Sequence, residues 1–100
     1  VSVTDNPDGG RYEARLDGQL AGVAWYELES GIIRFVHTEV DDAFAGRGVG
    51  GALARAALDD VRAKGERKVI PDCPFIRGWI GKHPDYSDLV SPDYTPSESL

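Results

Sequence analysis

The chain has 100 residues, of which 41% are hydrophobic, with a formal net charge of −6 and one cysteine. This length allows one domain with one core, and the acidic balance argues against a nucleic-acid partner, whose phosphates require a basic face. No apolar run approaches the ~20 residues that span a bilayer, and the single Cys73 forms no internal disulfide, so a cytoplasmic location without membrane attachment is expected.

The first half of the chain predicts a meander of strands after a turn-rich leader at residues 1–10. Asp17-Gly18 is a strong hairpin signal between strands at Tyr12–Leu16 and Leu20–Leu28. A further turn leads into a third strand, Ile32–Val40. Its apolar residues fall on both faces, so we expect this strand to be central and covered on both sides.

The middle of the chain predicts a long helix that ends at Lys64. Its apolar residues recur at three-and-four spacing, and Gly65 supplies a stop. Lys68–Pro71 is typical of a short strand, parallel to the third strand through a β–α–β crossover. Three charged residues on the opposite side of the helix are expected to pair along its surface: Arg55, Asp59 and Arg62.

A second helix is expected to begin at Pro74, because proline suits the first helical turn. Apolar residues follow at helical spacing: Phe75, Ile76, Trp79 and Ile80. Tyr86, beyond this helix, is expected to pack as an anchor. From Ser87 onward, prolines and serines predict a loosely ordered tail. The chain is therefore expected to be a single domain over residues 1–100, with its core at about 10–90.

A glycine-rich loop precedes the long helix: Ala45-Gly46-Arg47-Gly48-Val49-Gly50-Gly51. Glycines that open a helix leave backbone N–H groups uncovered at its positive end, which suits a phosphate. These glycines have no evident packing reason, which favours a ligand over an empty helix start. A dinucleotide fold shares the G-x-G-x-x-G pattern, but Asp41–Ala45 intervene after the strand and the upstream hairpins are foreign to it. A P-loop is excluded because no Gly-Lys-Ser/Thr follows.

The loop resembles the pyrophosphate-binding signature Gln/Arg-x-x-Gly-x-Gly/Ala of the GNAT superfamily of acyl-CoA-dependent N-acetyltransferases. Ala45 stands where that family has Gln or Arg, which is expected to weaken binding without abolishing it. The resemblance covers about residues 10–90 and points to a short stand-alone branch with a cysteine after the fourth core strand. Three segments carry it: His37-Thr38-Glu39-Val40, the loop with its helix, and Ile70-Pro71-Asp72-Cys73-Pro74-Phe75 with the later His83-Pro84-Asp85-Tyr86.

The resemblance implies a mixed α+β or α/β fold, with an antiparallel meander, then a β–α–β crossover, and flanking helices. It also implies a V-shaped opening between the third and fourth strands that holds acetyl-CoA or CoA. The residues implied to bind this cofactor are Val36, Thr38, Val40, Ala45, Gly46, Arg47, Gly48, Val49, Gly50 and Gly51. The second substrate is implied to be an amine of a small molecule, a polyamine or a protein. The chain itself is expected to be a monomer or a weak dimer.

His37 and Cys73 are the catalytic candidates. An imidazole can take a proton from an ammonium group. Strand alternation places His37 on the face of Ile33 and Phe35, where a hydrogen-bonded core histidine is the other interpretation. Cys73 is expected at or beside the N-cap of the second helix, where the helix dipole favours a thiolate. It could attack acetyl-CoA, protonate the departing sulfur, or be a small buried residue. No metal site is expected, because His37, Cys73 and His83 lack ligand spacing.

The sequence therefore favours a minimal GNAT-fold enzyme that moves an acetyl group from acetyl-CoA to an amine. Full-size relatives place two helices between their first strands to wall the acceptor site. Here Asp17-Gly18 is a tight turn, so an open acceptor side is expected. The alternative is a CoA-binding or acyl-CoA-binding module without turnover, which Ala45 and the missing wall favour.

Overall fold

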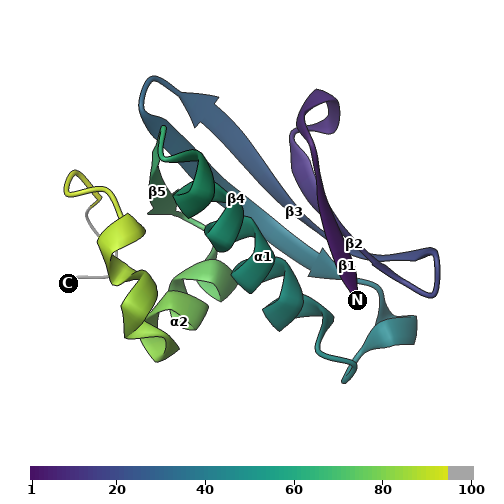
Figure 1. Cartoon of the computed structure of the whole chain (residues 1–100). Helices are drawn as coiled ribbons and strands as arrows, with labels where there is room; N and C mark the ends of the chain where they lie inside the picture. Colours follow the sequence, from purple (N-terminus) through teal and green to yellow (C-terminus); the bar gives the residue numbers. More distant parts are fainter. Residues whose placement is uncertain (95–100) are drawn as a thin grey trace.

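The computed structural model describes residues 1–94, which form one mixed sheet with helices packed against it (Figure 1). The sheet order is β1-β2-β3-β4-β5, with antiparallel pairing from β1 to β4 and parallel pairing of β4 with β5. The strands are β1 Ser2–Asn6, β2 Arg11–Leu16, β3 Gln19–Glu29, β4 Ile32–Val40 and β5 Lys68–Pro71. The helices are α1 Val49–Lys64 and α2 Pro74–Lys82, with 3-10 turns η1 Pro7–Gly9, η2 Asp42–Phe44 and η3 Pro84–Leu89. The predicted fold class is confirmed.

Helix α1 covers the sheet with one apolar side, as its spacing predicts. The buried residues of this helix are Val49, Leu53, Ala54, Ala57, Leu58 and Val61. Gly22 on β3 allows this approach, because a Cβ there would lie 3.0 Å from Val49 Cγ1 and 3.2 Å from Leu53 Cδ1. The helix ends where Gly65 adopts a left-handed conformation and its N–H bonds to Val61 O. The sheet and α1 therefore form the two layers of the core.

A β-bulge in β4 changes which side chains face this core. The register pairs Trp25 with His37 and Tyr26 with Phe35, so Val36 is an extra residue without a partner on β3. An extra residue inverts the alternation of side chains beyond it. The prediction that His37 shares a face with Phe35 is therefore wrong. The strand lies between β3 and β5 only as far as Phe35, so it is interior to the sheet over its first half. In residues 1–94 its outer face carries the exposed His37 and Glu39, so the prediction that both faces are covered is wrong.

The chain ends are more ordered than the sequence predicts. Residues 2–6 form β1 and pair with β2 from Ser2 opposite Arg15 to Asn6 opposite Arg11, so the predicted leader is a strand. Only its second half, the 3-10 turn η1, has the expected turn character. The backbone of β1 supplies hydrogen-bond partners for the edge of β2, which composition does not reveal.

The predicted loose tail from Ser87 is also wrong over its described part. Leu89 is buried, Val90 forms a bridge with Val69, and the Ser91 N–H donates to Val69 O at 2.8 Å. Burial of Leu89 holds the segment against the core, and the strand edge provides the backbone partner. The final part of the predicted tail, 95–100, lies outside the described residues.

The charged side of α1 binds the segment η3 rather than pairing along the helix. The Tyr86 hydroxyl donates to Asp59 Oδ1 at 2.7 Å and accepts from Arg55 at 3.2 Å. Arg62 donates to Asp88 at 2.9 Å. The hydrogen bond to Asp59, followed by burial, raises the pKa of Tyr86 above that of a free phenol. Tyr86 is thus a neutral anchor between η3 and α1, as predicted.

Candidate active site

The pairing of β4 with β5 stops halfway along β4. Ile32–Phe35 pair with Lys68–Pro71, and a last hydrogen bond runs from the Cys73 N–H to Phe35 O at 2.8 Å. The chain then turns away into α2. Within residues 1–94, no strand pairs with Val36–Val40 on this side. The backbone groups on this side of Val36–Val40 therefore have no strand partner in the described residues, and the divergence of β4 and β5 is hereafter called the fork.

An ion-pair bridge fastens the two strands at the closed end of the fork. Arg34 of β4 donates to Asp72, just after β5, at 2.8 Å and to Glu29 at 2.9 Å. The Arg34 hydrogen bond holds the pKa of Glu29 below its ordinary value. The bridge supports the β4–β5 pairing at the point where it ends.

The loop before α1 leaves the start of this helix uncapped. Gly46 and Gly48 have φ angles of 78° and 77°, a left-handed conformation that favours glycine. Gly48 is the N-cap of α1, makes no side-chain capping bond, and is followed by a first turn without acidic residues. The positive helix end and its free N–H groups therefore suit an anion. Ala45 and Arg47 are exposed on the same loop.

Two of the predicted cofactor-binding residues have packing roles that the sequence does not reveal. The Val49 side chain is buried in the core, so only its backbone could contact a ligand. A Cβ at Gly50 would lie 2.9 Å from Phe75 Cζ, so this glycine allows α2 to approach α1. The expectation that the glycines lack a packing reason is wrong for Gly50. At Gly46 and Gly48 a Cβ would meet nothing within 4 Å, so glycine is favoured there by the left-handed backbone conformation rather than by packing.

Cys73 and Thr38 meet on the helix-bearing side of the fork. Cys73 is the N-cap residue of α2 but forms no side-chain capping bond, and it is only 2% exposed. Its Sγ lies 3.3 Å from Thr38 Oγ1. Two residues that are 35 positions apart are thus joined where β5 leaves β4. The thiol is enclosed, in agreement with the interpretation of a small buried residue, and it also borders the fork.

His37 lies on the opposite face of the sheet from Cys73. Its ring stacks on Trp25 at 5.7 Å between centroids, and Nε2 lies 4.0 Å from Glu39 Oε2. The His37 side chain is 60% exposed, so the interpretation as a core histidine is wrong. The two catalytic candidates are therefore not brought together. They border the same fork from its two sides.

An acidic groove lies at the end of β4, where Glu39 and Val40 line it. Its volume is about 470 Å³, and its wall includes the carboxylates of Glu39, Asp41 and Asp42. The rest of its lining comes from Leu20, Ala21, Gly22, Val23 and Val40. Among residues 1–94, no lysine or arginine lines this groove. Its charge suits a cationic group on an apolar chain.

Phe75 differs from the other apolar residues that share its helical spacing in α2. Ile76, Trp79 and Ile80 are buried, whereas Phe75 is 44% exposed. Its ring stands over Gly50 at the start of α1, two residues after Cys73 in the chain. The sequence signal for Phe75 was its place in the motif Ile70–Phe75. Periodicity alone could not distinguish Phe75 from the buried residues, because all four share one helical spacing.

His83 has a structural role at the end of α2. Its ring stacks on Trp79 at 3.8 Å, and Nδ1 lies 2.8 Å from Trp79 O. Within the described part of the chain, no cluster of three or more His, Cys, Asp or Glu side chains could hold a metal ion. No helix in residues 1–94 is long and apolar enough to cross a membrane.

The five-stranded mixed sheet with its fork and the helix α1 crossover define a class of α+β domain, and comparison with known proteins identifies the family. A family model described as GCN5-related N-acetyl-transferase matches residues 11–89. The chain belongs to this family.

Relatives and solved structures agree with this assignment. The human protein NATD1 is 40% identical over 82% of this chain and 75% of its own length, and the mouse NATD1 is 36% identical over 82% and 77%. A GCN5-like protein from Staphylococcus aureus, solved by NMR, superposes with a TM-score of 0.68 at 20% identity over 98% of this chain and 93% of its own. A ribosomal-protein-alanine N-acetyltransferase from Brucella melitensis superposes with a TM-score of 0.55 at 20% identity, over 90% and 67%. At this identity the two structures establish the fold.

Proposed function

We propose that the protein is an acetyl-CoA-dependent N-acetyltransferase that binds its acyl donor in the fork. The observation that carries this proposal is the interruption of β4–β5 pairing after Phe35, beside a helix start that no side chain caps. Membership of the GCN5-related N-acetyltransferase family supports it. The residues of the fork fit this donor, since they offer free backbone groups and a positive helix end.

The diphosphate of the donor is assigned to the loop Ala45–Gly51. Backbone N–H groups at the start of α1 would hold it, with Arg47 free on the surface to pair with a phosphate. The backbone of Val36, Thr38 and Val40 would bind the pantetheine arm and polarise the thioester carbonyl. Phe75 extends the apolar wall beside Gly50. Acetyl-CoA supplies the activated acetyl group when it is bound.

The acceptor amine is assigned to the open face of the sheet, where His37 is exposed. His37 accepts a proton from the acceptor ammonium, directly or through water, so that the nitrogen can attack the carbonyl carbon. Glu39 Oε2 lies 4.0 Å from His37 Nε2. The groove with Glu39, Asp41 and Asp42 favours a cationic acceptor, such as a polyamine or a lysine-containing segment.

Cys73 is assigned as the proton donor to the leaving sulfur rather than as a nucleophile. As the C–N bond forms and the C–S bond breaks, the sulfur of the donor acquires a negative charge and needs a proton. The Cys73 thiol borders the fork on the helix-bearing side, opposite His37, so the amine would attack from the His37 side and the sulfur would depart toward Cys73. The thiol donates its proton to the leaving thiolate and is reprotonated from solvent after product release.

Mass spectrometry and calorimetry together test the proposal. Wild-type protein mixed with acetyl-CoA and spermidine is expected to yield acetylspermidine, with saturable CoA binding by calorimetry. Absence of CoA binding at millimolar concentration would overturn it. Tight CoA binding without transfer to any of a panel of amines would instead support a CoA-binding module. That second candidate rests on Ala45, which stands in place of the Gln or Arg of the family signature, and on the tight Asp17-Gly18 turn, which leaves no wall at the acceptor side.

A further inference from the structure

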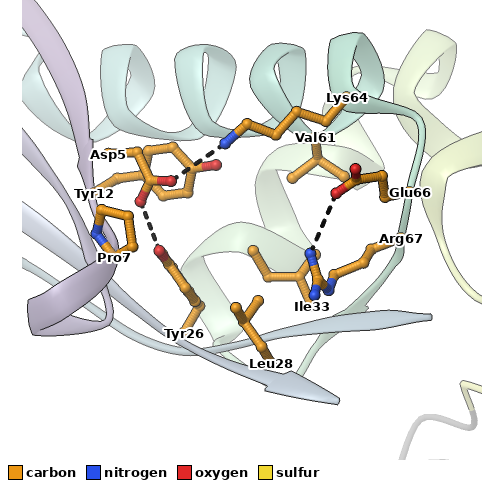
Figure 2. Close-up of a pocket in the computed structure, with 10 residues that line it drawn as sticks. All are labelled: Asp5, Pro7, Tyr12, Tyr26, Leu28, Ile33, Val61, Lys64, Glu66 and Arg67. Atoms are coloured by element: carbon orange, nitrogen blue, oxygen red, sulfur yellow. Dashed lines mark hydrogen bonds and ion pairs between the residues drawn. The ribbon is translucent and has the colours of Figure 1, made fainter. Parts of the chain in front are cut away.

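A separate cavity lies at the other end of α1 from the fork. It has a volume of about 240 Å³ and opens between the sheet and the C-terminal turn of α1 (Figure 2). The lining residues are Asp5, Pro7, Tyr12, Tyr26, Leu28, Ile33, Val61, Lys64, Glu66 and Arg67. None of these residues belongs to the proposed acetyl-transfer site.

Most polar groups at this cavity already have partners. The Tyr26 hydroxyl donates to Asp5 Oδ1 at 2.6 Å, and Lys64 donates to Asp5 Oδ2 at 3.3 Å. The Tyr12 hydroxyl donates to Asp60 at 2.7 Å, and Lys64 lies 2.9 Å from the same carboxylate. Burial and these carboxylates raise the pKa of both phenols, so they remain donors that saturate Asp5 and Asp60. Asp5 and Asp60 therefore already have donors, and Glu66 is the exposed carboxylate at this end.

Arg67 is the exception. Its Nε is buried and has no hydrogen-bond partner among the described residues. Its ion pair with Glu66 is long, at 3.7 Å from Nη1, and Glu66 is 70% exposed. The Arg67 side chain as a whole is 35% exposed and lines the cavity, so its Nη groups are the donors that an occupant could reach. Among the described residues, the guanidinium has no acceptor within hydrogen-bond distance, and Glu66 at 3.7 Å is its ion-pair partner.

The remainder of the wall is apolar. It comprises Pro7, Ile33, Val61, the two tyrosine rings, and Leu28, which is 51% exposed. The space exceeds the ~150 Å³ in which a protein cavity holds benzene. An occupant that fits must therefore combine a compact apolar body with an acceptor placed at the guanidinium.

We propose that this cavity binds a small carboxylic acid with a compact aliphatic or aromatic body. Its carboxylate accepts hydrogen bonds from Arg67, whose planar guanidinium matches a carboxylate, and its body lies against Ile33 and Val61. Binding would fix the segment between α1 and β5, because Arg67 leads directly into Lys68 at the start of β5. This site is independent of the proposed acetyl transfer.

Titration of the full chain with benzoate, followed by amide NMR shifts, tests the proposal. Saturable shifts are expected at residues that line the cavity. Benzyl alcohol, which keeps the ring but lacks the carboxylate, is expected to bind at least about tenfold more weakly, because a charge-assisted hydrogen bond is lost. Arg67→Gln is expected to weaken benzoate binding by a similar factor.

Two further variants separate this site from other anion sites and from misfolding. Arg47→Gln makes the same charge change at the far end of α1 and is expected to leave benzoate affinity unchanged. Val61→Leu places a larger side chain in the cavity and so reduces its volume. This variant is expected to weaken the binding of benzoate and of benzyl alcohol alike. The proposal is overturned by an absence of saturable shifts, by shifts centred on the loop before α1, or by an equal loss in Arg47→Gln. An absence of saturation would mean that the cavity holds only water.

Discussion

His37 and Phe35 are two residues apart on β4, yet their side chains lie on opposite faces of the sheet. Phe35 contacts Tyr12 and Tyr26 in the core, whereas His37 stacks on Trp25. The extra residue Val36 is the cause, since it shifts the register with β3. The bulge also lies where β5 ceases to pair with β4. One local irregularity therefore accompanies both the opening of the fork and the exposure of its candidate base.

Replacing His37 is expected to reduce acetyl transfer without affecting donor binding. His37→Ala should lower kcat by about 10²- to 10⁴-fold, the range for a lost general base. The dissociation constant for CoA and the free energy of unfolding should change little, because the side chain is exposed. Steady-state kinetics and calorimetry measure these quantities. His83→Ala is the matched control, expected to lower stability through its lost stacking on Trp79 while transfer persists. Equal kcat in both variants would contradict the assignment.

The left-handed glycine at the N-cap of α1 offers a test of the loop. Gly48→Ala should destabilise the fold by about 1–2 kcal/mol, because an L side chain is strained at this φ. It should also weaken CoA binding. Gly31→Ala introduces the same strain at φ 70°, likewise with open space around the Cβ, but far from the fork. Calorimetric affinities that fall equally in both variants would mean that the loop does not hold the ligand.

Gly50 and Phe75 should be energetically coupled. Alanine in a helix is favoured over glycine by up to about 1 kcal/mol, but a Cβ at Gly50 would collide with the Phe75 ring. In a Phe75→Ala background, Gly50→Ala should therefore stabilise the protein, whereas in the wild-type background the gain should be reduced or reversed. Denaturant unfolding of the four proteins of this cycle measures the coupling. Additive effects would show that the ring moves aside freely.

Cys73 should be protected from alkylation in the folded protein. The side chain is 2% exposed and lies against Thr38, so iodoacetamide should react slowly until the protein unfolds. Cys73→Ser retains a proton donor and should keep more transfer activity than Cys73→Ala. Mass spectrometry follows both the alkylation and any acetyl adduct. A stable acetyl group on Cys73 during turnover would show that it acts as a nucleophile instead.

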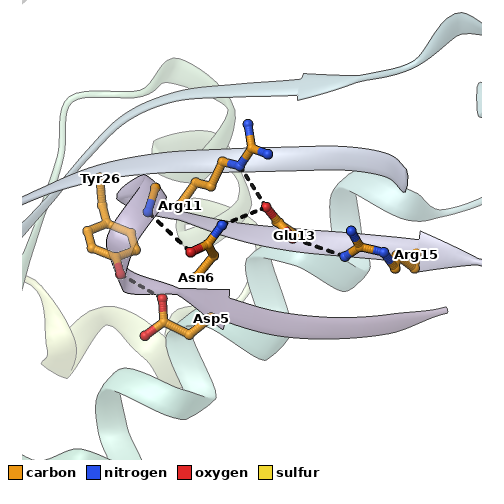
Figure 3. Close-up of polar contacts among 7 residues, drawn as sticks. Asp5, Asn6, Arg11, Glu13, Arg15 and Tyr26 are labelled. Atoms are coloured by element: carbon orange, nitrogen blue, oxygen red, sulfur yellow. Dashed lines mark hydrogen bonds and ion pairs between the residues drawn. The ribbon is translucent and has the colours of Figure 1, made fainter. Parts of the chain in front are cut away.

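Glu13 on the open face should make stability depend on pH in the acid range. Hydrogen bonds from Asn6, Arg15 and Arg11 lower its pKa to about 2 from 4.5 (Figure 3). A lowered pKa stabilises the folded state above pH 4.5, and this contribution disappears as the pH falls toward 2.

The comparison of wild type with Glu13→Gln measures this contribution. Wild type should be the more stable protein near neutral pH, and the difference should shrink steadily below pH 4.5. Thermal unfolding across that range provides the readout. A difference independent of pH would indicate that the carboxylate charge does not contribute.

The sequence by itself determined the elements that depend on local chemistry. Apolar spacing and Gly65 define α1, Asp17-Gly18 defines the β2–β3 hairpin, and Pro74 marks the start of α2. These signals act within a few residues, so they can be read without knowing which surfaces pack together in the fold. The family motif likewise located the loop before α1 and the position of Cys73.

Only the tertiary structure decided the face of His37, the pairing of residues 2–6 and the anchoring of Leu89. Each depends on a neighbour far away in the chain. The register with β3 makes Val36 an extra residue, β1 pairs with β2, and the Val69 carbonyl accepts a hydrogen bond from the Ser91 N–H. The same holds for Gly50, because the Phe75 ring leaves no room for a side chain at this position. Hydrogen bonding and close packing act between surfaces that meet only after folding, so a linear pattern carries no record of them.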